Sequence, residues 1–267
     1  MVKPCVFCGR TSKKSKEHIW PQWMHKYLYK TGNGEYISES STYEWQTHIK
    51  SQKEQRQGYL FTKKLRVICR SCNNGWMSNL EEETKPLLLA MMCGENRELS
   101  ANAQHTLARW VTMKAMVGEH AAKETAETPA KDRKRFMKCG EIPGYSAVYI
   151  GLTQRAVDTG WLRISKTISL SKDGSSPPLR GMNRNMQSIS ILCGPLFFFI
   201  ISIREKNFVA SEFLTLEKLL RVYPRVSETI KWPPEYKVTD HEKNNYAYAL
   251  DKLTEMKNVK YGGRNPP

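Results

Sequence analysis

Two short stretches decide the fold: Cys5-Val6-Phe7-Cys8-Gly9 and, further along, Cys69-Arg70-Ser71-Cys72-Asn73. A Cys-x-x-Cys pair on a tight turn places two thiolates at two corners of a tetrahedron, so two pairs complete a closed structural zinc site. The chain holds 7 cysteines, and this odd number, with no apolar run at the start, argues against a disulfide framework. A redox Cys-x-x-Cys is the alternative, but it usually comes as a single pair. We expect one zinc ion, held by Cys5, Cys8, Cys69 and Cys72.

Two polar motifs accompany the cysteines. Glu17-His18-Ile19-Trp20-Pro21 lies between the pairs, and Asn73-Asn74-Gly75-Trp76 follows the second pair at the start of an expected helix. In this order the first 85 residues resemble the HNH nucleases of the ββα-metal (His-Me finger) superfamily, in the zinc-stapled form typical of phage endonuclease VII. The resemblance implies that Glu17 and Asn73 hold a catalytic Mg²⁺ or Mn²⁺ and that His18 is the general base. The sequence departs from the family pattern at three places. Glu17 stands where the family usually has Asp, Asn73 stands where it usually has His, and residues 58–68 contain no Asn.

The same residues suit phosphodiester hydrolysis on chemical grounds. A hard cation neutralises charge on the phosphate and needs only one or two protein oxygens, while a neutral imidazole takes a proton from water. Successive side chains alternate along a strand, so Glu17 and His18 can serve these two roles only if the hairpin is distorted there. The alternative for Glu17-His18 is an exposed polar dipeptide, and the alternative for Asn73 is a helix N-cap.

The charge of the chain points to a polyanionic partner. The formal net charge is +16, and residues 1–79 hold 14 Lys and Arg against 5 Glu. DNA is the expected partner, RNA is not excluded, and a merely solvated basic surface is the alternative. We expect the phosphate contacts at Lys13, Lys14, Lys16, Arg70 and Asn74, which would orient a backbone without reading its sequence. Residues 30–58 look like an insertion in the hairpin, either a DNA-contact loop or a solvent loop.

Composition excludes several other classes. Hydrophobic residues make up 40% of the chain, enough for a core, so global disorder is not expected. The most apolar stretch, residues 189–203, is too short and too broken for a membrane helix, so we expect no membrane partner and a cytoplasmic protein. Trp20, Trp23 and Trp76 would either stack on bases or pack in the core. His25 and His48 are further candidates that are more typical of surface histidines.

The remaining chain is informative mainly about fold. Helices are expected over 73–84, 87–92, 100–122, 211–222 and 240–256, with a linker over 121–130 and a loop over 171–178. Strands are expected over 145–152, 161–168, 186–193 and 196–203, the last two joined by a turn at Gly194-Pro195.

The sequence therefore predicts an α+β protein. A zinc-stapled HNH nuclease domain spans 1–92, and an α+β accessory domain with an antiparallel sheet spans 93–267, for substrate recognition or regulation through a second copy or another partner. The expected activity is metal-dependent endonucleolytic cleavage of DNA. The alternative is a zinc-stapled nucleic-acid-binding protein without catalysis. A third interpretation is an enzyme that is inactive until its C-terminal domain binds a protein or nucleotide signal.

Overall fold

The computed structural model describes residues 4–30, 34–44, 47–121, 126–155, 159–170, 184–205, 216–247 and 259–262. Within them the chain is an α+β protein whose sheets are antiparallel, which confirms the expected fold class. No helix in these ranges is both long enough and apolar enough to cross a bilayer.

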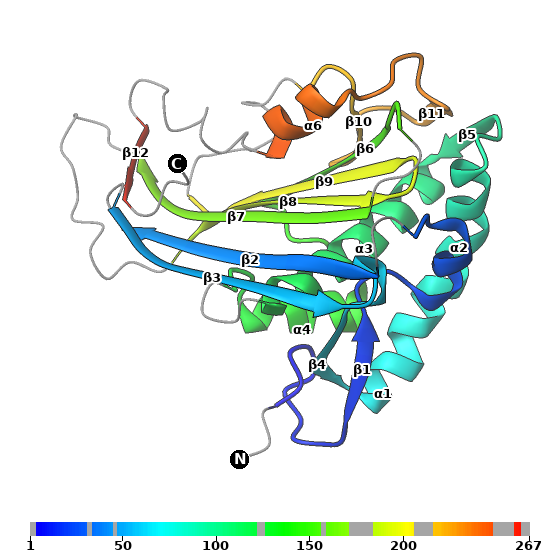
Figure 1. The fold of residues 1–267 in the computed structure, drawn as a ribbon. Helices are drawn as coiled ribbons and strands as arrows, with labels where there is room; N and C mark the ends of the chain where they lie inside the picture. The colour runs from blue at the N-terminus through cyan, green and yellow to red at the C-terminus, as the bar shows by residue number, and fades with distance from the viewer. Residues whose placement is uncertain are drawn as a thin grey trace.

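The first unit is a hairpin followed by helix. β1 (Lys14–His18) pairs antiparallel with β4 (Lys64–Cys69), and the chain then enters α1 (Arg70–Cys72), a π-helical turn (Asn73–Met77) and α2 (Ser78–Met92). Figure 1 shows this hairpin below the larger sheet, with α1 at its end. The strand–strand–helix order brings the two Cys-x-x-Cys segments to the same end of the hairpin.

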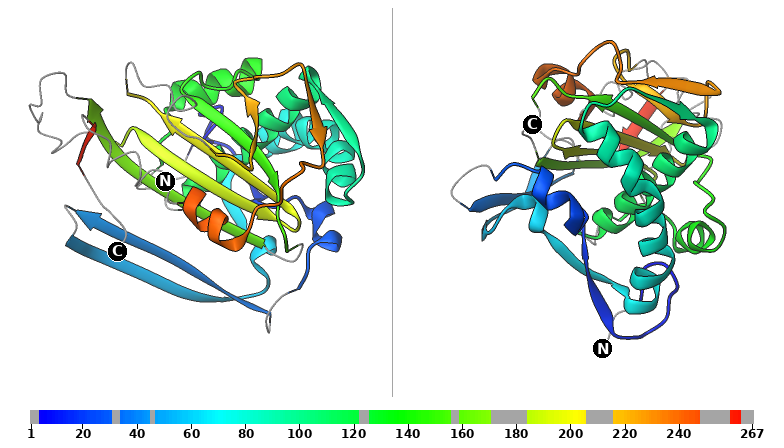
Figure 2. Two further views of the ribbon diagram at one scale, coloured as in Figure 1. Left: turned by 90° about the horizontal axis from the view of Figure 1, so that it is seen from above. Right: turned by 90° about the vertical axis from the view of Figure 1, so that its right-hand side faces the viewer.

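A long ribbon is inserted between the two strands of this hairpin. It consists of β2 (Glu35–Glu44) and β3 (Thr47–Gln57), which pair antiparallel along their whole length. Gly58 N donates to the carbonyl of Gly34 at 2.6 Å, so the ribbon leaves and rejoins the first unit at one point. The expected insertion is thus confirmed, but it is a two-stranded ribbon and not the expected loop. The left view in Figure 2 shows it apart from the larger sheet.

The second unit is built on a six-stranded antiparallel sheet. Its strands, in spatial order, are β10 (Leu220–Tyr223), β6 (Ser146–Leu152), β9 (Leu196–Ile203), β8 (Met186–Cys193), β7 (Thr159–Leu170) and β12 (Val259–Gly262). β8 and β9 have the predicted bounds, and the Gly194 turn between them has φ +60°, which glycine adopts without strain. β6 and β9 are buried along their whole length, which places them at the centre of the core.

Helix α3 (Ala101–Gly118) joins the two units. It begins as predicted, because Ser100 Oγ accepts a hydrogen bond from Ala103 N at 3.3 Å. It contacts β4 and α2 of the first unit and β6, β9 and β10 of the sheet. Trp20 of the first unit is fully buried and donates from Nε1 to the Leu192 carbonyl at 2.8 Å. One buried apolar cluster therefore runs from Cys5 through Trp110 to Phe198.

Three helix predictions need correction. Residues 78–92 of the two helices expected over 73–84 and 87–92 form a single helix α2 with Pro86 inside it, while residues 73–77 form the π-helical turn. Leu80, Leu88 and Met91 are buried on one face, and their burial, about 1.5–3 kcal/mol each, offsets the cost of about 3 kcal/mol of an internal proline. The helix expected over 211–222 is wrong at its end, where β10 pairs with β6, while 211–215 lie outside the described residues.

Other predicted elements are described only in part or not at all, and some elements were not predicted. The helix expected over 240–256 is confirmed as α6 (Asp240–Ala247) up to the last described residue before 248–256, and the loop expected over 171–178 lies outside the described residues. The linker expected over 121–130 ends where α4 (Ala130–Cys139) begins, a helix that no pattern indicated. β5 (Arg97–Ser100) and β11 (Thr229–Trp232) form another small sheet that was also missed.

Candidate zinc centre and acid–histidine site

The four paired cysteines form one cluster. The sulfur atoms of Cys5, Cys8, Cys69 and Cys72 all lie within 4.8 Å of one another, and Cys8 Sγ is 3.6 Å from Cys69 Sγ. Three of the four side chains are buried, and Cys8 is half-buried. Four converging thiols are the ligand set of a closed structural zinc site, so the residues fit the expected ion.

Local backbone geometry brings the two pairs together. Gly9 has φ +75° and donates to the Cys5 carbonyl at 2.9 Å, which folds the first pair into a tight knuckle. Cys69 ends β4, and its backbone N donates to Cys5 Sγ at 3.4 Å. Burial acts to raise the pKa of the Cys69 thiol, but hydrogen bonds from Cys72 and Ser71 outweigh it and lower that pKa to about 6. A thiol that ionises readily is a ready metal ligand.

Glu17 and His18 lie at the end of β1, where the hairpin is distorted. Ser15 pairs with Ile68 and Glu17 with Leu65, so β4 carries one extra residue opposite Lys16. Such a bulge kinks the strand pair and re-aims the side chains beside it. Glu17 is 7% exposed, and His18 is half-buried. The hairpin is therefore distorted one residue before the motif, while Glu17 and His18 themselves pair in regular register with Leu65 and Lys64.

The Glu17 carboxylate is bound by a buried lysine of α3. Lys114 Nζ donates to Glu17 Oε1 at 2.7 Å and to the His18 carbonyl at 3.1 Å, and it also bonds Glu81 Oε1 of α2. Lys114 is 1% exposed. Burial alone would lower the pKa of Lys114, but the carboxylates of Glu17 and Glu81 raise it above its usual value. The ammonium therefore stays charged beside Glu17.

His18 sits in surroundings that keep its imidazole neutral. Burial lowers its pKa most, and the positive charges of Lys64 and Lys114, with the His25 ring, lower it further to about 4. The His18 and His25 rings meet edge to face with centroids 5.4 Å apart. His25 also lies 3.2 Å from the Trp20 carbonyl and packs against Phe61, so its expected role as a surface histidine is wrong. A neutral imidazole can accept a proton at physiological pH.

Asn73 is directed at β1 and has a different partner from Glu17. Its Nδ2 donates to Ser15 Oγ at 2.9 Å. The helical run begins at Arg70, with Cys69 in the N-cap position, so the N-cap alternative for Asn73 is wrong. The residue lies instead at the start of a π-helical turn whose backbone departs from helical geometry at Gly75. The structure thus brings Glu17 and His18 together with Lys114, Glu81 and His25, and ties Asn73 to the other end of β1.

The expected nucleic-acid contacts lie at the surface near the cysteines. Lys13, Lys16, Arg70 and Asn74 are exposed, and Lys14 donates from Nζ to the Val67 carbonyl of β4 at 3.3 Å. Trp20 is core, and Trp76 packs edge-on against Phe7 at 4.9 Å, so core packing is confirmed for both. Trp23 is half-buried beneath Lys85, and the side chain of His48 lies outside the description.

Sequence reasoning missed Lys114 and Glu81. One signal for Lys114 was available, because it is the one charged residue in the apolar run from Trp110 to Val117. A charge in such a run is rarely buried without a partner. Glu81 gave no comparable signal, because it is the first of three consecutive glutamates.

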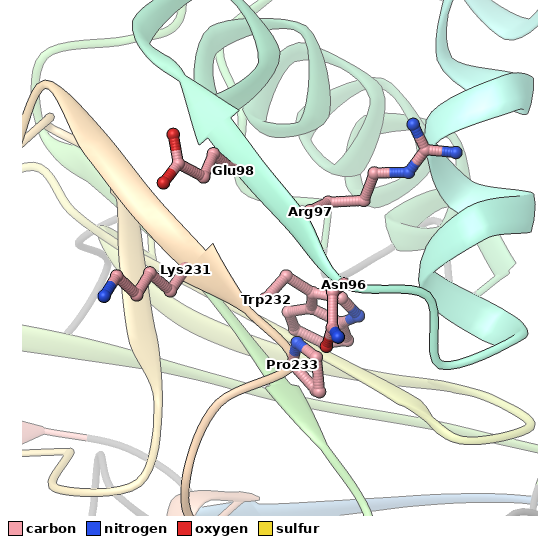
Figure 3. Close-up of a pocket in the computed structure, with 6 residues that line it drawn as sticks. All are labelled: Asn96, Arg97, Glu98, Lys231, Trp232 and Pro233. Atoms are coloured by element: carbon pink, nitrogen blue, oxygen red, sulfur yellow. The ribbon is translucent and has the colours of Figure 1, made fainter.

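A hollow of about 390 Å³ lies elsewhere, on the β5–β11 sheet. Figure 3 shows the six residues that line it, Asn96, Arg97, Glu98, Lys231, Trp232 and Pro233. None of them belongs to the cysteine cluster or to the Glu17–His18 end of β1. Comparisons with protein-family models, with curated proteins and with solved structures find no significant match for this chain.

Proposed function

We propose that the chain is a metal-dependent endonuclease that hydrolyses phosphodiester bonds in DNA, with His18 as its general base. One observation carries this proposal: a neutral, half-buried imidazole (His18) directly follows a buried carboxylate (Glu17) in the sequence, at the distorted end of a hairpin whose other end carries the four thiols. Proton abstraction from water requires such a neutral base, and general-base catalysis typically contributes about 10²–10⁴ in rate.

The proposed reaction also needs a positive charge at the phosphate. The resemblance assigns this to a Mg²⁺ or Mn²⁺ ion on Glu17 and Asn73, which would neutralise developing charge and stabilise the leaving oxygen. Carboxylate and amide oxygens are the ligands such ions prefer. The surroundings of Glu17 fit a cation, because the Glu17 and Glu81 carboxylates already converge on the Lys114 ammonium. Asn73 bonds Ser15 through its nitrogen, which leaves its amide oxygen as the atom that would serve as ligand.

The charge distribution supports a nucleic-acid substrate near the zinc unit. Lys13, Lys14 and Lys16 lead directly into Glu17-His18, Arg70 lies within the second cysteine pair, and Asn74 follows that pair. Residues 35–57 of the ribbon hold four Glu against three Lys and Arg, so the ribbon itself has no excess of positive charge. We therefore propose that the phosphate backbone lies along β1 and α1, and not along the ribbon.

A second candidate is a zinc-stapled nucleic-acid-binding protein without catalysis. Two contacts favour it, because Lys114 holds the Glu17 carboxylate and Ser15 holds the Asn73 amide. In this case the zinc unit and its basic surface would bind DNA, and the Glu17–Lys114–Glu81 contacts would serve only stability.

A metal titration separates the two candidates. Zinc-loaded wild type, Glu17→Ala, Asn73→Ala and His18→Ala are assayed for nicking of supercoiled plasmid over a range of Mg²⁺ and Mn²⁺ concentrations. Loss of a ligand weakens metal binding, so excess metal should partly restore Glu17→Ala and Asn73→Ala, while His18→Ala stays inactive. Wild type that binds plasmid but cuts neither plasmid nor single strands with any divalent ion would support the non-catalytic candidate.

A further inference from the structure

Lys114 occupies a position where a charge is costly. It lies in the middle of α3, between the buried side chains of Met113 and Ala115, and is itself 1% exposed. Without a partner in such a place, the Lys114 side chain would have to lose its proton or turn toward solvent. Its retention in a charged form therefore depends on the groups that surround its Nζ.

Those groups come from two other elements. β1 supplies the Glu17 carboxylate at 2.7 Å and the His18 carbonyl at 3.1 Å, and α2 supplies the Glu81 carboxylate. Two carboxylates on one ammonium leave a net charge of one negative unit. Both residues of the acid–histidine motif are thus bound by the same atom of α3, one through its side chain and one through its backbone.

We propose that Lys114 is a positioning residue of the nuclease site, which fixes the end of β1 and sets the divalent-metal affinity of Glu17 by competing for its carboxylate. The inference rests on the proposed role of Glu17 as a metal ligand. A cation bound to Glu17 would lie a few ångströms from the Lys114 ammonium, because that ammonium is 2.7 Å from Glu17 Oε1. Repulsion between like charges at that distance weakens metal binding strongly where water is excluded.

Mn²⁺ binding measured by calorimetry on the zinc-loaded full chain tests this without any cleavage assay. Lys114→Met removes the competing charge and keeps an unbranched side chain, so its dissociation constant for Mn²⁺ should fall by about tenfold or more. Lys114→Arg keeps the charge and should bind Mn²⁺ like wild type. Lys166→Met is the matched control, because Lys166 is also 1% exposed but belongs to β7.

Glu81→Gln tests the same effect of charge on Mn²⁺ affinity by removing a negative charge instead of a positive one. It removes one negative charge while Lys114 stays paired with Glu17, so Mn²⁺ should bind several-fold more weakly. This variant and Lys114→Arg decide the question if Lys114→Met fails to fold, as zinc content and circular dichroism would reveal. Unchanged Mn²⁺ affinity in Glu81→Gln and in folded Lys114→Met, or no Mn²⁺ binding by any variant, would overturn the proposal.

The outcome is separable from that of the proposed function. A shift in Mn²⁺ affinity without any cleavage by wild type would support the control of metal affinity by Lys114 and contradict the nuclease. Cleavage by wild type with no shift in Mn²⁺ affinity would leave the nuclease intact and remove the role of Lys114.

Discussion

At the scale of single residues, His18 owes its chemistry to its neighbours. Burial together with Lys64 holds its pKa at about 4, so the imidazole is neutral at every pH well above that value. A general base works in its neutral form, and its activity falls as the pH drops through its pKa. The acid limb of kcat/KM should therefore lie near pH 4, and not near the ordinary histidine value of about 6.5.

Changing Lys64 should move that limb in a known direction. Lys64→Gln removes a nearby positive charge, which makes protonation of His18 easier and raises its pKa. The imidazole titration followed by NMR should shift upward, and the acid limb of cleavage should shift with it. Lys231→Gln, an exposed lysine on β11, is the control and should leave both unchanged. A His18 titration unaffected by Lys64→Gln would contradict this electrostatic explanation.

The sequence predicted the cysteine cluster but not the partners of Glu17. Each Cys-x-x-Cys pair is a local pattern, and two such pairs predict one shared metal site. Lys114 lies far along the chain from Glu17, and only the packing of α3 against the hairpin brings them together. Nothing local to Glu17 could identify that partner.

At the scale of elements, the cysteine cluster holds the hairpin to the helix that follows it. We expect Cys69→Ser to lose zinc and to destabilise the first unit, because metal binding supplies much of the folding free energy of a small metal-bound unit. Elemental analysis and thermal unfolding measure the two effects. Cys93→Ser and Cys139→Ser are matched controls, since both cysteines are exposed and lie outside the cluster. Equal zinc content and stability in Cys69→Ser and the controls would rule out a structural zinc.

Elements with a strong repeating pattern were predicted well, and elements fixed by distant pairing were not. β8, β9 and the start of α3 follow from apolar runs, a turn glycine and a serine cap. β10 carries a helical pattern, yet it pairs with the edge of β6, because tertiary pairing overrides local propensity. Pro86 was a misleading stop signal, because the buried face of α2 continues through it.

At the scale of the whole molecule, the positive charge predicts how the proposed binding to DNA depends on salt. Each lysine or arginine on a phosphate contributes about 0.9 to the slope of log K against log salt on duplex DNA. Replacing Lys13, Lys14 and Lys16 together by Gln should flatten that slope, most of all through exposed Lys13 and Lys16. The same replacement of the basic ribbon residues Lys50, Lys53 and Arg56 should leave that slope unchanged. The opposite result would place the binding surface on the ribbon.

Helix α3 also connects the second unit with the proposed site. The apolar cluster is continuous from Cys5 to Phe198, and α3 carries Lys114 from that core to Glu17. A boundary near residue 92 follows from the motifs, but the motifs contain no information about packing across it. A shift of α3 would therefore change the contacts of Lys114 with Glu17 and His18.

The most direct measurement compares plasmid nicking by wild type, His18→Ala and His25→Ala in the presence of Mn²⁺. The two histidines are neighbours at 5.4 Å, so His25→Ala controls for local disturbance. Loss of the general base should reduce the rate of His18→Ala by about 10²–10⁴ while zinc content and DNA binding persist, and His25→Ala should lose far less. Cleavage by His18→Ala at the wild-type rate would contradict the account.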